Sequence, residues 1–272
     1  MMDMSRPLPR LAFGPGGVAP GQRQLPAEVA VALSFNGTTQ AVMMATPDSL
    51  EDFARGFALT EGIATGAQIE SVTVVETVGG IDVQVWLRAE AEARLANRRR
   101  TMAGPVGCGL CGIDSLAEAV RALPPVPASG LHLTPRQVLA AVAALPGGQP
   151  LHDATRAAHA AGFWVPDSGM VAICEDVGRH NALDKLAGLL AREGRDCTSG
   201  AVVLTSRVSI DLVQKCTVMG VSVMIAVSAP TTAAVALAEA CGITLIAVAR
   251  VDRFEVFTHT TRILMNEVTD VA

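Results

Sequence analysis

The sequence contains no tyrosine and only two tryptophans and seven phenylalanines among its 272 residues. Half of the residues are nevertheless hydrophobic, so the chain can bury a sizeable core, and global disorder is excluded. Because aromatic residues are scarce, this core must consist mainly of small aliphatic side chains. The length allows one large domain or two of ordinary size.

An excess of positive charge is also missing. The formal net charge is -5, so no global positive field attracts the protein to nucleic acid, and we expect no nucleic-acid partner. A local basic cluster remains at Arg98, Arg99 and Arg100.

Long uninterrupted hydrophobic runs are absent as well. Residues 1–24 are rich in proline and glycine and lack the apolar segment of a secretory signal. Residues 218–249 are apolar, but Pro230 and its polar neighbours divide them into pieces too short to cross a bilayer. Buried strands and helices of a parallel sheet have the same composition. We therefore expect a cytoplasmic protein without a membrane partner.

The six cysteines include only one closely spaced pair, and without a secretory context a disulfide framework is not expected. We interpret the other four as small hydrophobic residues. These are Cys174, Cys197, Cys216 and Cys241.

The first part of the chain has the pattern of a small α+β domain, which we place at residues 27–97, after a flexible segment at 1–26. Two β-type runs, 28–35 and 39–45, meet at Asn36-Gly37, a strong hairpin signal. A helix is predicted from about residue 50 to 61, and a second hairpin at 71–78 and 81–87.

The pattern changes after this domain. Residues 98–112 combine arginines, glycines and two cysteines without apolar periodicity, which predicts an exposed, mobile loop. Helices are expected at about 113–122 and 134–145. From Met170 onward, strands alternate with turns and helices, which is typical of an α/β layer with a largely parallel sheet. We assign residues 113–272 to this second domain.

The loop contains the pair Cys108 and Cys111, each flanked by glycine. Such thiols can approach a partner closely, and nearby arginines favour the thiolate, which acts as nucleophile or sulfur carrier. A zinc knuckle would need four ligands, commonly two such pairs, and only one pair is present. A thioredoxin-like redox site would need the pair at the start of a helix that follows a strand. A sulfur-transfer loop fits the pattern better, and we expect no structural metal.

Three polar turns precede predicted helices, at 175–181, 205–209 and 228–232. If the preceding strands are parallel, these turns lie at one edge of the sheet, where helix N-termini, hydroxyls and arginines can bind an anion. A phosphate-bearing ligand is therefore expected there, although each turn alone could be an ordinary capped helix start. His159 has the surroundings of a core histidine. Arg250, Asp252 and Arg253 could bind phosphate or simply end a strand in solvent.

In combination, these motifs resemble the FdhD family of formate dehydrogenase accessory sulfur carriers over residues 28 to 262. The most specific segment is Glu175-Asp-Val-Gly-Arg-His-Asn181. Further matching segments are Gly107-Cys-Gly-Leu-Cys-Gly112, Leu183-Asp-Lys185, Ser206-Arg-Val-Ser209, Val213-Gln-Lys215, Val227-Ser-Ala-Pro-Thr231, Thr60-Glu-Gly-Ile63 and Met43-Met44.

The resemblance implies a sulfurtransferase that takes sulfur from a cysteine desulfurase as a persulfide on Cys108 or Cys111. The sulfur would pass to the molybdenum of bis-molybdopterin guanine dinucleotide, bound as cargo, before the cofactor enters the catalytic subunit of formate dehydrogenase. It also implies a homodimer, and a three-layer C-terminal domain similar to the cytidine deaminase fold. The residues matched to the guanine nucleotide part of the cofactor are Arg179, His180, Arg207, Ser209, Ser228, Thr231, Val248, Ala249, Arg250, Val251, Asp252 and Arg253.

One position departs from the family pattern. Arg156 stands where many members have glycine, three residues before His159, which puts the local backbone geometry in question.

Two alternative functions have different requirements. A zinc deaminase needs His-x-Glu, but Ala161 stands at the glutamate position. A non-catalytic chaperone that binds the cofactor without moving sulfur is the second alternative. Trapping a persulfide would separate it from a carrier.

Overall fold

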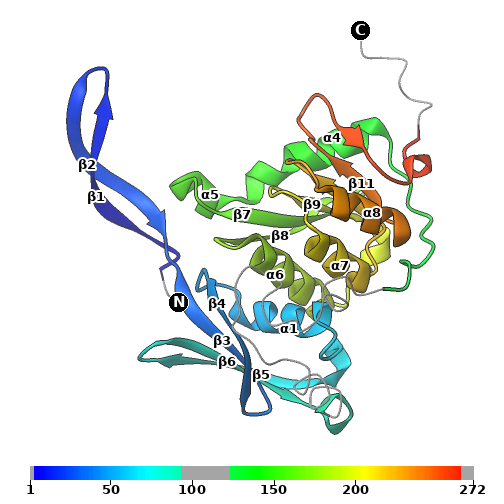
Figure 1. Cartoon of the computed structure of the whole chain (residues 1–272), viewed down its shortest axis with the longest axis horizontal. Helices are drawn as coiled ribbons and strands as arrows, with labels where there is room; N and C mark the ends of the chain where they lie inside the picture. The colour runs from blue at the N-terminus through cyan, green and yellow to red at the C-terminus, as the bar shows by residue number, and fades with distance from the viewer. Residues whose placement is uncertain (1–2, 93–122, 265–272) are drawn as a thin grey trace.

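The computed structural model describes residues 3–92 and 123–264 (Figure 1). The predicted loop at 98–112, with Cys108 and Cys111, and the predicted helix at 113–122 lie outside the described residues. The described part of the chain is a mixed α/β structure with three sheets.

The largest sheet has six strands in the order β12-β11-β10-β9-β7-β8. Strands β9, β10 and β11 pair in parallel, while β7 is antiparallel to both β8 and β9. Four strands, β8 to β11, therefore run in the same direction. The strand bounds are β7 His159–Val165, β8 Gly169–Asp176, β9 Ala201–Leu204, β10 Val223–Ala226, β11 Thr244–Ala247 and β12 Glu255–Val256.

Helices cover both faces of this sheet, so this part of the chain has three layers (Figure 1). One face packs against α6 (Arg179–Arg192), α7 (Ile210–Met219) and α8 (Thr232–Ala240). The opposite face packs against α4 (Pro135–Ala144). The residues of the central strands β9, β10 and β11 are all buried and are mainly alanine, valine, leucine and isoleucine, as expected from the scarcity of aromatic residues.

The second sheet has four strands in the order β4-β3-β6-β5. Its two hairpins join through parallel pairing of β3 with β6. One face packs on α1 (Leu50–Thr60) around Phe35 and Phe53. The strand bounds agree closely with the sequence prediction and are β3 Val29–Phe35, β4 Thr38–Ala45, β5 Ile69–Thr77 and β6 Gly80–Leu87.

Helix α1 packs backbone to backbone against α6, and two glycines make this approach possible. A Cβ atom on Gly56 would lie 1.7 Å from the Asp184 carbonyl oxygen, and one on Gly188 would lie 1.9 Å from the Asp52 carbonyl oxygen. The contact is supplemented by a bidentate ion pair in which the Arg192 guanidinium donates to the Asp52 carboxylate at 2.7 and 3.0 Å.

Residues 5–26 differ from the flexible segment that the sequence predicts, because they form an antiparallel hairpin of β1 (Ser5–Gly14) and β2 (Gly17–Pro26). The register explains how a proline-rich segment can pair. Its four strand prolines all occupy alternate pairs of the ladder, so that every missing N–H can point outward. These pairs are Ser5↔Pro26, Pro7↔Gln24, Pro9↔Gln22 and Leu11↔Pro20.

The apolar stretch 218–249 contains β10, α8 and β11 of the six-stranded sheet. In the described ranges, no helix is long and apolar enough to span a bilayer.

Candidate functional site

The three polar turns converge at one edge of the six-stranded sheet. Strands β8, β9 and β10 run in the same direction, and each is followed by a turn and by helix α6, α7 or α8. Strand β11 ends at the same edge and leads into residues 248–254. His159 begins the antiparallel strand β7 between them, opposite Asp176. The geometric part of the sequence prediction is therefore confirmed: the predicted turns share one edge.

Hydrogen bonds connect these turns to one another. The Val208 amide donates to the Ala229 carbonyl at 3.2 Å, and the Thr231 amide donates to the Val208 carbonyl at 2.9 Å. The Val248 amide donates to the Ser228 carbonyl at 3.2 Å, which connects the third turn to the segment after β11. The second turn, the third turn and the segment after β11 therefore form one hydrogen-bonded rim.

Two arginines bring positive charge toward His159. Burial lowers the pKa of His159, and the positive charges of Arg179, His152 and Arg207 lower it further. Arg179 begins helix α6, whose free backbone N–H groups add positive potential. A neutral imidazole among two guanidinium groups and a helix N-terminus is a favourable environment for an anion.

The His180 side chain lies against helix α7. Its Nε2 contacts the Asp211 carboxylate on α7, and both side chains are largely buried. Burial lowers the pKa of His180, although Asp211 partly opposes this shift. Nearby, the Ser209 hydroxyl is buried and has no hydrogen-bond partner among the residues that the structure describes. His180 thus connects the first turn to the second, while Ser209 keeps an unused hydroxyl beside them.

The segment after β11 has an unusual backbone. Val248 has φ 51, a left-handed conformation that is costly for a β-branched residue. The Arg250 guanidinium donates to the carbonyl oxygens of Val227 and Ala249, so it stabilises the rim. Val251 is 70% exposed, and Asp252 and Arg253 are solvent-exposed neighbours. Strain of this kind often marks a functional segment.

Ser228 and Thr231 have separable roles in the third turn. The Thr231 hydroxyl caps helix α8 by accepting from the Ala234 amide at 3.2 Å. Ser228 instead accepts a hydrogen bond from the Val248 amide through its backbone carbonyl.

Much of the motif at 175–181 is structural. The Glu175 carboxylate accepts from the amides of Leu151 and His152, both at 2.8 Å, and so holds the N-terminus of α5 (Pro150–Thr155). Asp176 is fully buried and pairs with Lys185 at 2.7 Å. The Asn181 amide donates to the Asp176 carboxylate at 2.9 Å.

A second buried ion pair, which joins Lys215 and Asp184, was not predicted from the sequence. The Lys215 ammonium on α7 donates to both oxygens of Asp184 at 2.9 and 3.0 Å and to Glu61 at 3.0 Å. Burial alone would lower the pKa of Lys215, but Asp184 and Glu61 raise it, so the ammonium remains charged. The sequence could have indicated this ion pair, because Lys215 lies on an apolar helix face and a buried lysine requires an oppositely charged partner.

The four cysteines of the described residues have properties of structural thiols. Burial raises the pKa of Cys174 to about 12 and that of Cys197 to about 11, and it also raises the pKa of Cys216. Cys241 is buried. Because the thiolate is the reactive form, the first three are poor nucleophiles near neutral pH.

Comparison with known proteins extends these observations. A sequence model described as the FdhD/NarQ family matches residues 26–264. A protein of Agrobacterium fabrum named sulfur carrier protein FdhD is 49% identical over 262 residues, which cover 96% of each chain. A protein of the same name from Brucella abortus is 50% identical over 262 residues, covering 96% of this chain and 97% of its own.

A solved structure has the same fold. The crystal structure of a putative formate dehydrogenase accessory protein from Desulfotalea psychrophila superposes with a TM-score of 0.75 at 24% sequence identity, covering 96% of this chain and 100% of its own. Given the family match and relatives at about half identity over nearly the whole length, the chain belongs to the FdhD/NarQ family.

Proposed function

We propose that this protein is a sulfur carrier for the molybdenum cofactor of a formate dehydrogenase. It accepts sulfur from a cysteine desulfurase as a persulfide on Cys108 or Cys111. It then transfers the sulfur to bis-molybdopterin guanine dinucleotide, its cargo, before that cofactor is inserted into the catalytic subunit of formate dehydrogenase. The names of the relatives, sulfur carrier protein FdhD, support the sulfur part of this proposal.

The first transfer is a thiolate exchange. A thiolate of this chain attacks the outer sulfur of the desulfurase persulfide, a new S–S bond forms, and the desulfurase cysteine leaves as a thiolate. No external oxidant is needed. The glycine-flanked pair Cys108 and Cys111 suits this step, because Cys174, Cys197 and Cys216 have raised pKa values.

The observation that best supports cargo binding is that the turns containing Arg179 and Arg207 lie at one edge of the sheet, where the positive charges of both arginines lower the pKa of His159. Each guanidinium can bind two phosphate oxygens. The buried Ser209 hydroxyl and the helix N-termini offer further hydrogen-bond donors. We assign this edge to the guanine nucleotide part of the cofactor, with His180, Ser228, Thr231 and residues 248–253 forming its walls.

Other parts of the proposal concern architecture and assembly. We infer that the three-layer part is related to the cytidine deaminase fold, which is consistent with its mixed sheet and its helices on both faces. We further infer that the protein works in the cytoplasm as a homodimer.

The nucleotide assignment can be tested by calorimetric titration with GDP, which represents part of the cofactor. Losing one charged, desolvated contact costs on the order of 2–3 kcal/mol, roughly 30- to 150-fold in affinity. We therefore expect Arg179→Ala and Arg207→Ala each to weaken GDP binding by about that factor. Arg136→Ala, on the exposed surface of α4, is the matched control and should bind GDP normally.

Persulfide loading by the desulfurase should remain normal in Arg179→Ala and Arg207→Ala, because loading uses the cysteine pair. Unchanged GDP affinity in both variants would remove the sheet edge from the proposal. A wild-type protein that binds GDP but never carries a persulfide would instead favour the alternative, a non-catalytic cofactor-binding chaperone.

A further inference from the structure

The hairpin of β1 and β2 extends away from the rest of the molecule (Figure 1). Its base is fixed by a hydrogen bond from the Ala27 amide to the Met4 carbonyl at 2.7 Å and by one from the Arg23 guanidinium to the Thr155 carbonyl at 3.3 Å. Toward the tip, Leu11, Phe13 and Val18 are 62%, 78% and 57% exposed. An isolated two-stranded hairpin is at best marginally stable in water, so this arm gains stability if something covers it.

The pairing register separates the chemistry of the arm's two faces. Residues directly opposite each other share a face, and successive residues alternate between faces. One face carries Arg6, Arg10 and Arg23, the three arginines of residues 5–26, which contain no acidic residue. The other face is mainly apolar and consists of Pro7, Pro9, Leu11, Phe13, Val18 and Pro20, with Gln22 and Gln24 nearer the base.

The prolines restrict how a partner can bind the arm. Pro7 and Pro9 on β1 and Pro20 on β2 occupy positions whose N–H would point outward from the ribbon. Neither edge can therefore offer a continuous row of donors for an added strand. A partner must instead contact the faces of the arm and its tip.

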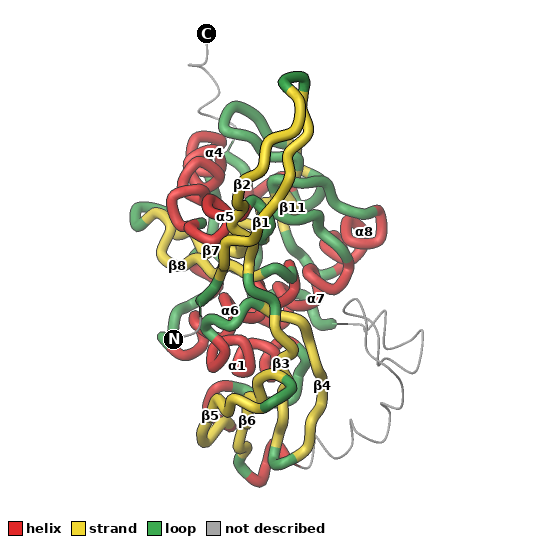
Figure 2. The backbone as a smooth tube through the Cα atoms, turned by 90° about the vertical axis from the view of Figure 1, so that its left-hand side faces the viewer, coloured by secondary structure: helices red, strands yellow, loops and turns green. Residues whose placement is uncertain are grey.

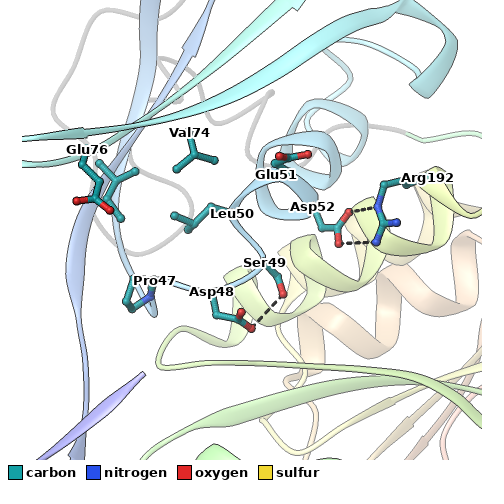
Figure 3. Close-up of a pocket in the computed structure, with 10 residues that line it drawn as sticks. Pro47, Asp48, Ser49, Leu50, Glu51, Asp52, Val74, Glu76 and Arg192 are labelled. Carbon is teal, nitrogen blue, oxygen red and sulfur yellow. Dashed lines mark hydrogen bonds and ion pairs between the residues drawn. The ribbon is translucent and has the colours of Figure 1, made fainter. Parts of the chain in front are cut away.

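A pocket of complementary character lies between the start of α1 and the strands β5 and β6 (Figure 3). Its volume is about 640 Å³, enough for several side chains. Apolar walls come from Leu50, Val74 and Ile81. Glu51 and Glu76 add carboxylates that form no ion pair within the described part of the chain. Arg192 also lines the pocket but is paired with Asp52, so the pocket offers an apolar surface and an excess of negative charge.

The arm does not reach this pocket in its own subunit. Figure 1 shows its tip at the opposite end of the molecule from α1 and β5, beside which the pocket lies. Figure 2, turned by 90°, shows the same separation. A complementary arm and pocket on one chain that cannot meet within it can meet between two copies, each arm binding the partner in a closed two-fold arrangement.

We propose that the β1–β2 arm of one subunit binds the acidic pocket beside α1 of a second copy, and that the exchange is reciprocal. Phe13 and Val18 at the tip contact the apolar wall around Val74, and Arg10, on the other face of the arm, pairs with Glu76. This assignment rests on the homodimer proposed above and specifies its contact surfaces.

The test is the dimer dissociation constant, measured by sedimentation across a dilution series of the full-length protein. Phe13→Asp should raise it by roughly 30-fold, because buried aromatic anchors dominate interface energies. Arg10→Glu and Glu76→Arg should each raise it by about 10-fold, and the combined variant should return to within about 3-fold of wild type, because reciprocal exchange restores the charge pair.

Matched controls lie on exposed surfaces outside the pocket. Arg136→Glu on α4 and Glu70→Arg at the other end of β5 should leave the constant unchanged. The proposal is overturned if Phe13→Asp and Arg10→Glu dimerise like wild type, or if the combined variant shows no recovery. A monomeric wild-type protein would reject both this interface and the proposed homodimer, whereas GDP binding and persulfide loading test the sulfur-carrier function separately.

Discussion

At Arg156 the backbone adopts φ 57 and ψ 26 at the C-terminus of α5, a left-handed conformation that favours glycine. A glycine at this position would adopt this conformation without strain. The Arg156 side chain forms an ion pair with Asp153 at 3.2 Å, but both side chains are about 60% exposed, so the pair contributes little. The backbone strain at Arg156 is therefore local, and strand β7, which follows it, remains paired on both sides in the sheet.

We predict that Arg156→Gly raises the free energy of unfolding by about 0.5–1 kcal/mol, because relief of left-handed strain exceeds the entropy that glycine adds to the unfolded chain. Urea denaturation measures the change. Arg136→Gly, at an ordinary helical position in α4, is the matched control and should lower stability by about the same amount. A decrease in both variants would show that Arg156 is unstrained.

The protonation state of His159 should make GDP binding depend on pH. Burial and the neighbouring cations lower the pKa of His159, so the free protein keeps it neutral near pH 7. A bound phosphate favours the protonated ring, so binding takes up a proton and GDP affinity should increase as the pH falls from about 8 to about 5.

GDP phosphate itself also titrates in this range, so the matched variant is His159→Gln, which cannot titrate. The expected result is a weaker pH dependence of the GDP dissociation constant in His159→Gln than in wild type. Identical pH dependence in the two proteins would place His159 away from the phosphate.

At the scale of elements, the contact between α1 and α6 depends on two glycines that bring the helix backbones together. Gly56→Ala would place a methyl group against the Asp184 carbonyl oxygen, and neither backbone can yield easily. We predict a loss of at least about 3 kcal/mol in unfolding free energy, measured by urea denaturation. Gly66→Ala, where nothing lies within 4 Å of the added Cβ, should change stability by less than about 1 kcal/mol. Equal, small effects would contradict the close packing.

The elements that sequence reasoning located best have strong local signals. Asn36-Gly37 specifies the β3–β4 hairpin, and the periodicity of Leu50, Phe53 and Phe57 specifies α1. The edge that gathers the three turns followed from the order of strands and helices alone, because parallel strands end at one edge.

Among the strands, β7 and the two strands of the β1–β2 arm were not predicted, for different physical reasons. Strand β7 begins in an alanine-rich stretch without alternation, because it lies inside the sheet and is covered on both faces. The β1–β2 arm contains prolines that argue against a strand, and only the pairing register reveals that they avoid the ladder hydrogen bonds. In both cases, the contacts that make the segment a strand come from residues that a short window of sequence does not contain.

At the scale of the whole molecule, buried charges connect the two larger sheets through the helices between them. Lys185 on α6 donates to the Thr46 carbonyl at 3.0 Å, just after β4, and Lys215 on α7 donates to the Thr60 hydroxyl at 3.0 Å. The sequence suggested two domains. Because their contact consists of close helix packing and buried ion pairs, we expect the two to unfold together.

This arrangement assigns different tasks to different parts of the protein. The sheet edge with Arg179 and Arg207 is the proposed nucleotide site, the arm and acidic pocket are the proposed dimer contact, and the cysteine pair is the proposed carrier of sulfur. The central claim is the last of these, since it separates a sulfur carrier from a cofactor-binding chaperone.

The measurement that tests it most directly is intact-protein mass spectrometry after incubation with a cysteine desulfurase and cysteine. We expect wild type to gain the mass of one sulfur atom, which a thiol reductant removes. Cys197→Ala, which removes a half-buried thiol with a raised pKa, should load equally well. Cys108→Ala/Cys111→Ala should gain no sulfur. Persistent loading of this double variant, or a wild type that never gains sulfur, would show that the Cys108–Cys111 pair is not the sulfur carrier.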